Sequence, residues 1–358
     1  MTTDCLKLTS YFGERHRVGG RYTADALLDL YGRSELAASI LLRGAEGFGL
    51  RQHLRTDRSL TLSEDLPLVA VAVDTRPRIE AVLDQTAQLN KPGLVTLERA
   101  MLMDGTAPGG QLPGDLRDTA KLTVYLGRYE RAWRVPAFVA VCDLLYRRGI
   151  AGATALLGVD GTIRGQRERA RFFGSNAAVP MMVIAVGSGE RIAQVIPELG
   201  GVLDRPVMTL ERVTVCKRDG QLLARPDALP GTDARGMALW QKLTIFTSEA
   251  ASYQGQTVHR AITRRLRAAG ISGVTTLRGV WGFHGDHRPH GDRLLSAARR
   301  VPAVTIVIDS PQRAATAFTV IDELTAGGGL VTAETVPAMR ATAPGREEGG
   351  LRLAARRD

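Results

Sequence analysis

The chain has few cysteines, few aromatic residues and no long apolar run, and each shortage excludes a class of protein. Its three cysteines, Cys5, Cys142 and Cys216, show no CxxC or paired spacing. A disulfide framework is therefore excluded, and a reducing compartment is indicated. No apolar segment reaches the ~18 residues needed to span a bilayer, and no signal peptide opens the chain. We expect a cytoplasmic protein that is not transmembrane.

Aromatic residues make up 5% of the 358 residues, whereas hydrophobic residues make up 44% and glycines number 39. This balance predicts a core of small aliphatic side chains, with many tight turns. The formal net charge of +10 is compatible with nucleic acid, an anionic membrane surface or small phosphorylated ligands. No block of Arg and Lys with interleaved aromatics occurs, so a nucleic-acid partner is not expected. A solvated basic surface is the alternative interpretation of the charge.

A glycine-rich stretch recurs three times along the chain. The first copy is Leu42–Gly49, with Gly44, Gly47 and Gly49. Related copies occupy residues 156–163 and 277–284. Regular recurrence of this kind indicates a triplicated unit.

Each unit has the same predicted order of elements. A period-two strand begins with Lys-Leu-Thr, at Lys7, Lys121 and Lys242, and an amphipathic helix follows. A second strand leads into the glycine stretch and a polar loop of about twenty residues, a length typical of functional loops. A nearly all-apolar third strand, a second helix and a fourth strand complete the unit.

This order, β-α-β-loop-β-α-β, predicts an α+β fold of three tandem ferredoxin-like domains. Because the third strand is apolar throughout, we expect it to be covered on both faces, with the other repeats supplying the second cover. Gly/Pro/Asp-rich segments between the units are predicted linkers. The predicted boundaries are repeat one at 1–104, a linker at 105–119, repeat two at 120–218, a linker at 219–239, repeat three at 240–340 and a disordered basic tail at 341–358.

Repeat one carries residues that resemble a known family. These are Leu6-Lys7-Leu8, the stretch Arg43–Gly49, His53, and Leu62–Pro67. They resemble the PII-like signalling proteins, and most closely the PII-like group catalogued as uncharacterised domain family 190. The resemblance implies a regulatory protein, not an enzyme, folded as an intramolecular pseudo-trimer of one chain. It further implies a small anionic effector, with ATP or ADP as candidates, bound in clefts between repeats. Mobile loops would be presented to a membrane transporter, a channel or a metabolic enzyme.

The candidate effector-binding residues follow from the glycine stretch and from this resemblance. Glycines permit the backbone conformations of an anion-binding nest, and the alternative is a hinge for a mobile loop. In repeat two Gly161-Thr162-Ile163 has lost the Phe-Gly pair, so its loop is expected to bind nothing. The candidates are Gly44, Gly47, Phe48, Gly49, His53, Ser63 and Asp65 in repeat one, and Gly279, Gly282, Phe283 and His284 in repeat three.

Two other functions remain open from the sequence. The histidines His284, His287 and His290 with nearby aspartates are a weak metal candidate, which would make the chain a metal-binding or small-molecule enzyme. A ligand-free structural interaction module is the third hypothesis. His53, Ser63 and Asp65 lack a nucleophile elbow and oxyanion donors, so a hydrolase triad is not favoured.

Carboxylates recur on the three last strands, at Glu98, Glu211 and Glu334. The recurring lysines of the first strands, at Lys7, Lys121 and Lys242, are their natural partners. We predict salt bridges across the repeat interfaces, with ligand contact as the alternative.

Overall fold

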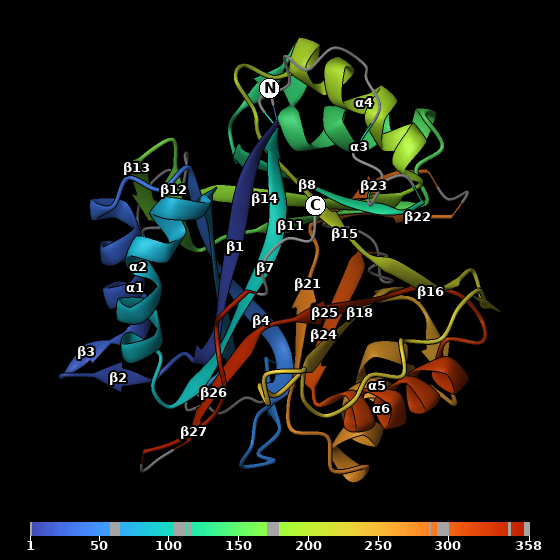
Figure 1. The fold of residues 1–358 in the computed structure, drawn as a ribbon. Helices are drawn as coiled ribbons and strands as arrows, with labels where there is room; N and C mark the ends of the chain where they lie inside the picture. Colours follow the sequence, from blue (N-terminus) through green and yellow to red (C-terminus); the bar gives the residue numbers. More distant parts are fainter. Residues whose placement is uncertain are drawn as a thin grey trace.

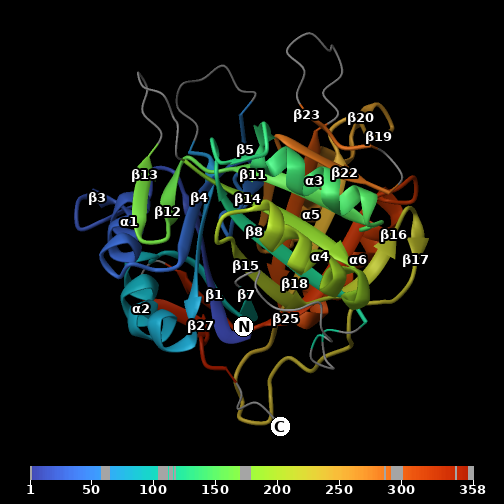
Figure 2. The same cartoon turned by 90° about the horizontal axis from the view of Figure 1, so that it is seen from above.

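The protein is described by a computed structural model, shown in Figure 1 and turned by 90° in Figure 2. It describes residues 2–57, 65–103, 112, 116, 118–169, 179–285, 288–291, 301–342 and 345–353. Within these ranges it is a mixed α/β structure, in which three pairs of helices lie outside a curled arrangement of strands (Figure 1). No helix in the described ranges is long and apolar enough to cross a membrane.

The long elements follow one order in each repeat: strand, helix, strand, strand, helix, strand. In repeat one they are β1 (Thr2–Gly13), α1 (Thr23–Arg33), β4 (Ala38–Phe48), β6 (Pro67–Thr75), α2 (Arg76–Leu89) and β7 (Gly93–Met103). In repeat two they are β8 (Ala120–Gly127), α3 (Ala137–Arg147), β11 (Gly152–Leu157) with its continuation β12 (Asp160–Ile163), β14 (Pro180–Gly187), α4 (Gly189–Val202) and β15 (Val207–Arg212). In repeat three they are β18 (Trp240–Ser248), α5 (Val258–Ala268), β21 (Val274–Arg278) with its continuation β22 (Trp281–His284), β24 (Pro302–Asp309), α6 (Pro311–Leu324) and β25 (Leu330–Val336).

Shorter strands lie between these long elements and after the last of them. They are β2 (Arg17–Val18), β3 (Arg21–Tyr22), β5 (Arg55–Thr56), β9 (Arg131–Ala132), β10 (Val135–Pro136), β13 (Gln166–Arg169), β16 (Thr214–Arg218), β17 (Gln221–Leu222), β19 (Ser252–Tyr253), β20 (Gln256–Thr257), β23 (His290–Gly291), β26 (Ala338–Thr342) and β27 (Arg346–Gly349).

The first strand of each repeat lies in the middle of an antiparallel sheet. In repeat one β1 pairs with β6 on one side and with β7 on the other, and β4 pairs with the outer edge of β6. The β8 and β18 strands take the same place in repeats two and three. This register places Lys7 directly opposite Glu98. The equivalent registers in repeats two and three place each recurring lysine opposite the recurring glutamate of its own repeat.

The third strand of each repeat is buried on both faces, as its apolar sequence predicts. On β6, Leu68 and Ala70 pack with the helices of their own repeat. Their neighbours Val69 and Val71 join a central cluster that also contains Met182 of β14 and side chains of repeat three. Because strand side chains alternate between faces, one apolar run serves two cores. The expected cover by the other repeats is confirmed.

The last strand of each repeat extends into the next one and thereby joins the three repeats in a ring. The end of β7 pairs with β15 of repeat two, and β16 pairs with β25 of repeat three. The strand β26 then pairs with β7 of repeat one. The strand that follows repeat three thus pairs with the edge of the sheet of repeat one, which links the last repeat to the first.

The predicted disordered tail at 341–358 is wrong for most of its length. Ala341 and Thr342 belong to β26, which pairs with β27, and Leu351 and Leu353 pack against the core of repeat one. The basic composition of the tail indicated disorder, but the edge of β7 offers unpaired backbone groups that order it. Residues 354–358 lie outside the described part of the tail.

Candidate functional site: a basic cavity between repeats one and three

The recurring glycines lie where strands of neighbouring repeats meet. The extended second strand of each repeat pairs with the second strand of another: β4 with β21, β12 with β4, and β22 with β11. A Cβ would come closer than 3.0 Å to a backbone oxygen of the neighbouring repeat in each case: to Val274 at Gly47, to Ser39 at Gly161 and to Ala153 at Gly282. Real Cβ atoms essentially never approach so closely, so the junctions require glycine.

A proline packs over each of these glycines from the start of the third strand. The Cβ position of Gly47 lies 3.1 Å from Cγ of Pro67, and that of Gly282 lies 2.9 Å from Cγ of Pro302. Gly44 is held in the same way, with its Cβ position 2.6 Å from Cγ of Pro67. The shared glycine and proline positions are thus explained by close packing between repeats, without any ligand.

The pairing between repeats one and three ends one position earlier in the glycine stretch than the pairing at the other two junctions. In repeat two the ladder runs to Ile163 opposite Ala38, and in repeat three it runs to His284 opposite Gly152. In repeat one it stops at Phe48 opposite Val274. The next residue, Gly49, has no atom within 4 Å of its Cβ position. Gly49 still lies beside repeat three, with its Cα 3.7 Å from the Cβ position of Gly273, but its own Cβ position faces open space.

A cavity of about 530 Å³ occupies this space, with walls from both repeats. That volume falls within the range of small-molecule sites, roughly 300 to 1,000 Å³. Repeat one contributes Phe12 and Phe48, and repeat three contributes Val274, Ile306 and Ile308. These apolar walls would cover the flat or aliphatic part of a ligand.

Basic side chains face the same cavity. Four arginines line it, Arg15, Arg51, Arg55 and Arg340, together with His16 and His53, whereas Asp65 is its lining carboxylate. Asp65 is already engaged, because it forms a 2.8 Å ion pair with Arg55 and accepts a 2.7 Å hydrogen bond from the backbone N–H of Arg15. The remaining positive charge favours an anionic ligand. Burial lowers the pKa of His16, so this side chain is biased toward its neutral form.

Arg340 brings the ring-closing strand β26 into the cavity wall. Its guanidinium lies 4.4 Å from the ring centroid of Trp240, and its nearest approach to Asp309 is 3.8 Å. Burial lowers the pKa of Arg340, and the carboxylates of Asp309 and Glu348 offset part of this shift. A cation on an aromatic face within about 6 Å is stabilised by the ring quadrupole, so β26 is anchored by this contact as well as by its backbone pairing.

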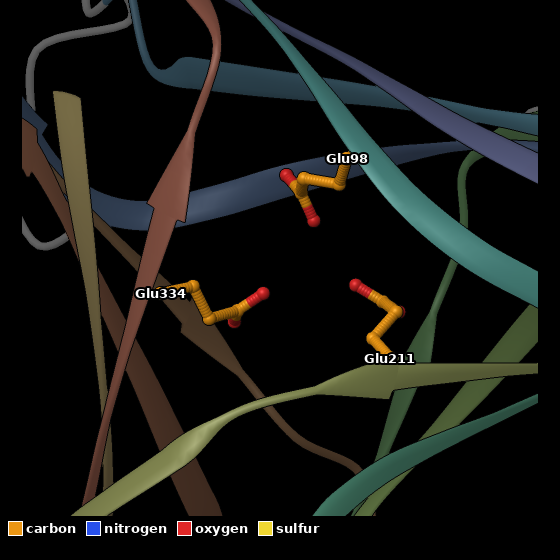
Figure 3. A group of neighbouring side chains, drawn as sticks. All are labelled: Glu98, Glu211 and Glu334. Atoms are coloured by element: carbon orange, nitrogen blue, oxygen red, sulfur yellow. The ribbon is translucent and has the colours of Figure 1, made fainter. Parts of the chain in front are cut away.

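A second polar cluster, here called the charge ring, joins all three repeats at the centre. Figure 3 shows its three carboxylates pointing toward one another from β7, β15 and β25. Lysine–glutamate pairs connect them both within and between repeats. The pairs are Lys7–Glu98 at 2.6 Å, Lys121–Glu211 at 3.0 Å, Lys121–Glu334 at 2.5 Å, Lys242–Glu98 at 3.0 Å, and Lys7–Glu211. The predicted salt bridges across the repeat interfaces are confirmed.

The charge ring sets the protonation of its members. Burial would raise the pKa of Glu98, but the surrounding lysines, Lys242 first, hold it well below its usual value. Burial would lower the pKa of Lys7, but the carboxylates, Glu211 first, raise it. Lys242 differs, because burial and repulsion from the other lysines outweigh Glu98 and lower its pKa. The three carboxylates are close enough together to suggest a metal site, yet the buried ammonium groups already neutralise them.

The sequence matches one family model three times. The family is DUF190, described as "Uncharacterized ACR, COG1993", and the matches cover residues 5–102, 119–215 and 240–338. The chain belongs to the DUF190 family. Among solved structures, the DUF190 chain is similar to an aspartate kinase from Synechocystis, at 10% identity and a TM-score of 0.22. The alignment covers 96% of this chain and 46% of the kinase chain, so the DUF190 chain spans less than half of that protein.

The structure brings together part of the predicted site of this DUF190 protein. Phe48, Gly49, His53 and Asp65 all line the cavity. Gly44 and Gly47 lie beside it in the strand junction. Ser63 lies outside the described residues.

The candidates in repeat three are placed elsewhere, at the junction with repeat two. Gly279 and Gly282 serve that junction, and Phe283 is buried in the core of repeat two, with its ring 5.3 Å from that of Tyr146. His284 is half-buried at the end of β22. Of the metal candidates, His290 Nδ1 lies 2.8 Å from the carbonyl oxygen of Arg288, and His287 lies outside the described residues.

Sequence reasoning missed most of the basic side chains in this DUF190 cavity. Arg51 and Arg55 flank His53 in the same loop, so their spacing was an available signal. Arg15 and His16 follow β1, and only the fold brings them beside that loop. Arg340 lies about 290 residues further along, and no local pattern connects it with repeat one.

Proposed function

We propose that the chain is a PII-like regulatory protein whose three repeats are ferredoxin-like units arranged as an intramolecular pseudo-trimer. The supporting observations are the strand order, with β4 and its counterparts at one edge of each sheet, and the ring of pairings between repeats. Covalent linkage keeps each repeat at an effective concentration of around millimolar for the others. The protein acts as a monomer of one chain in the cytoplasm, as a regulator and not as an enzyme.

The effector is a small anion with an apolar part, and an adenine nucleotide such as ATP or ADP fits this description. The observation that carries the proposal is the cavity between repeats one and three, where aromatic and aliphatic walls meet four arginines. A phosphate group would bind the arginines, because bidentate guanidinium–phosphate hydrogen bonds are strong and directional. The base would lie against the apolar wall around Phe48.

Binding would act on the loop that leaves the cavity. Arg51, His53 and Arg55 lie at the start of this segment, and Asp65 lies at its end. A ligand that binds these basic side chains favours the loop conformations in which they face the cavity, and its differential affinity sets the size of the shift. The partner that reads the loop is a membrane transporter, a channel or a metabolic enzyme.

Nucleotide binding is expected to raise the melting temperature. One site filled at 100 times Kd adds about 2.7 kcal/mol to the free energy of unfolding. We expect ATP or ADP at millimolar concentration to raise the melting temperature in differential scanning fluorimetry. The double variant Arg51→Gln/His53→Gln should reduce this shift, because a lost charge-assisted hydrogen bond weakens binding by about tenfold or more.

The matched control for that experiment is Arg205→Gln. Arg205 is 83% exposed and lies in repeat two, so its replacement removes the same charge without touching the cavity. Its nucleotide response should equal that of the wild type. No shift with any adenine nucleotide would refute nucleotide binding and leave a ligand-free interaction module as the function. Equal shifts in both variants would refute binding at this cavity and place the nucleotide at another site.

A further inference from the structure

Repeat two carries a small hairpin that differs from its two counterparts. The strands β9 and β10 form a separate two-stranded sheet just before α3. The pair β2–β3 occupies the same place before α1, and β19–β20 occupies it before α5. The tips of the three hairpins are Gly19-Gly20, Trp133-Arg134 and Gln254-Gly255.

Trp133 is a poor residue for the conformation it adopts. Its φ is 57°, matching φ 56° at Gly19 and 48° at Gln254. A bulky side chain is rare at positive φ, where Gly, Asn and Asp are preferred. Trp133 is also 73% exposed, so it contributes little to the core. Neither the turn nor the core explains a tryptophan here, which points to an external contact.

The surroundings of Trp133 are aromatic and basic. Tyr129 is 55% exposed, and the guanidinium of Arg128 lies 5.7 Å from its ring centroid. Arg131 donates a 2.7 Å hydrogen bond to the carbonyl oxygen of Arg134, which fixes the turn. The hairpin's acidic residue, Glu130, accepts a 3.2 Å hydrogen bond from the backbone N–H of Gly127. The tip thus presents two aromatic rings among three arginines.

We propose that the β9–β10 hairpin docks the protein on an anionic phospholipid surface. Tryptophan and tyrosine partition into the headgroup region of bilayers, where their rings are apolar and their polar groups stay hydrated. Arginines beside them bind lipid phosphates, and each basic residue near an anionic leaflet improves binding by about fivefold.

A membrane fits this hairpin better than a folded protein partner does. A standard protein interface buries about 800 Å² per partner, from twenty or more residues. The hairpin offers two aromatic rings and three arginines on a turn of two short strands. A fluid headgroup layer requires no matching surface, so a small basic and aromatic tip suffices to engage it.

Vesicle co-sedimentation of the full chain tests this proposal. We expect the wild type to sediment with phosphatidylcholine vesicles containing phosphatidylglycerol and to stay soluble with phosphatidylcholine alone. Trp133→Gly should weaken binding by about tenfold or more, because the indole that would be buried among the lipid headgroups is lost. This variant restores the residue type of Gly19 and should fold at least as well as the wild type. Arg128→Gln/Arg134→Gln should weaken binding by about 25-fold at fivefold per charge.

Two further observations make the test decisive. Tyr22→Ala, in the corresponding hairpin of repeat one, is the control and should bind like the wild type. The fluorescence of exposed Trp133 should shift to the blue on anionic vesicles, and this shift should be absent in Trp133→Gly. Binding that ignores lipid charge, or that survives both hairpin variants, would overturn the proposal. So would Trp133-dependent retention on an acidic protein without any vesicle binding, which would assign the hairpin to a protein partner.

Discussion

Glu98→Gln is expected to lower the free energy of unfolding by about 3 to 5 kcal/mol, the usual cost of breaking a buried ion pair. Glu98 is 3% exposed and contacts Lys7 and Lys242. Lys7 keeps Glu211 after the substitution, but Lys242 loses the carboxylate it contacts. The amide has nearly the same shape, so the loss reports the charge and not a cavity. Urea unfolding measures it.

The matched rescue is the double variant Glu98→Gln/Lys242→Met. It removes the stranded ammonium and leaves Lys7, Lys121, Glu211 and Glu334 as a balanced set. We expect it to recover a large part of the loss, as apolar replacements of buried ion pairs commonly do. Glu323→Gln, in an exposed pair with Arg265, should change stability little. A rescue no better than Glu98→Gln alone would contradict the role given to Lys242.

Acidification should reduce the difference in the free energy of unfolding between the wild type and Glu98→Gln. The pKa of Glu98 lies well below the ordinary value of 4.5 in the fold. A depressed carboxyl pKa adds stability that is present above the unfolded value and is lost as pH falls toward the folded one. This difference in stability should therefore be constant near neutral pH and become smaller below about pH 4.5.

Gly282→Ala is expected to cost about 3 kcal/mol or more. Its φ is 151°, and the new Cβ would fall closer than 3.0 Å to the carbonyl oxygen of Ala153 in repeat two. Strained φ and overpacking each cost about 1 to 3 kcal/mol. Relief would require the strands β22 and β11 to separate. Thermal unfolding and hydrogen exchange at residues 152–155 should both report the loss.

Gly49→Ala is the matched glycine variant. No atom lies within 4 Å of its Cβ position, so the substitution should leave stability almost unchanged. Both glycines belong to copies of one sequence stretch, and the structure assigns them opposite tolerance. Equal destabilisation by the two substitutions would show that the glycines serve the loop hinge and not the strand junctions.

The sequence predicted the repeats and their element order because these depend on local periodicity. The apolar third strand at Leu68–Val73 required two covered faces, and the lysine and glutamate recurrences required partners. The sequence could not show that Gly47 and Gly282 lie at strand junctions. A close approach between two chain segments is marked in the sequence only by the glycine that permits it. A nest, a hinge and a junction all favour the same residue.

The cavity between repeats one and three also exceeded what the sequence could predict. Its walls come from segments of two repeats that are far apart in the chain, and no local pattern connects them. Arg340 and the ring-closing strand were hidden by a basic composition typical of disorder. The order of the tail comes from the edge of β7, about 240 residues earlier in the chain.

Calorimetric titration of ATP or ADP into the wild-type chain tests the central claim most directly, because it counts sites. Three equivalent clefts would bind three nucleotides per chain. The cavity of about 530 Å³ between repeats one and three predicts one bound nucleotide per chain. A stoichiometry near three, or no heat at millimolar nucleotide, would contradict the account.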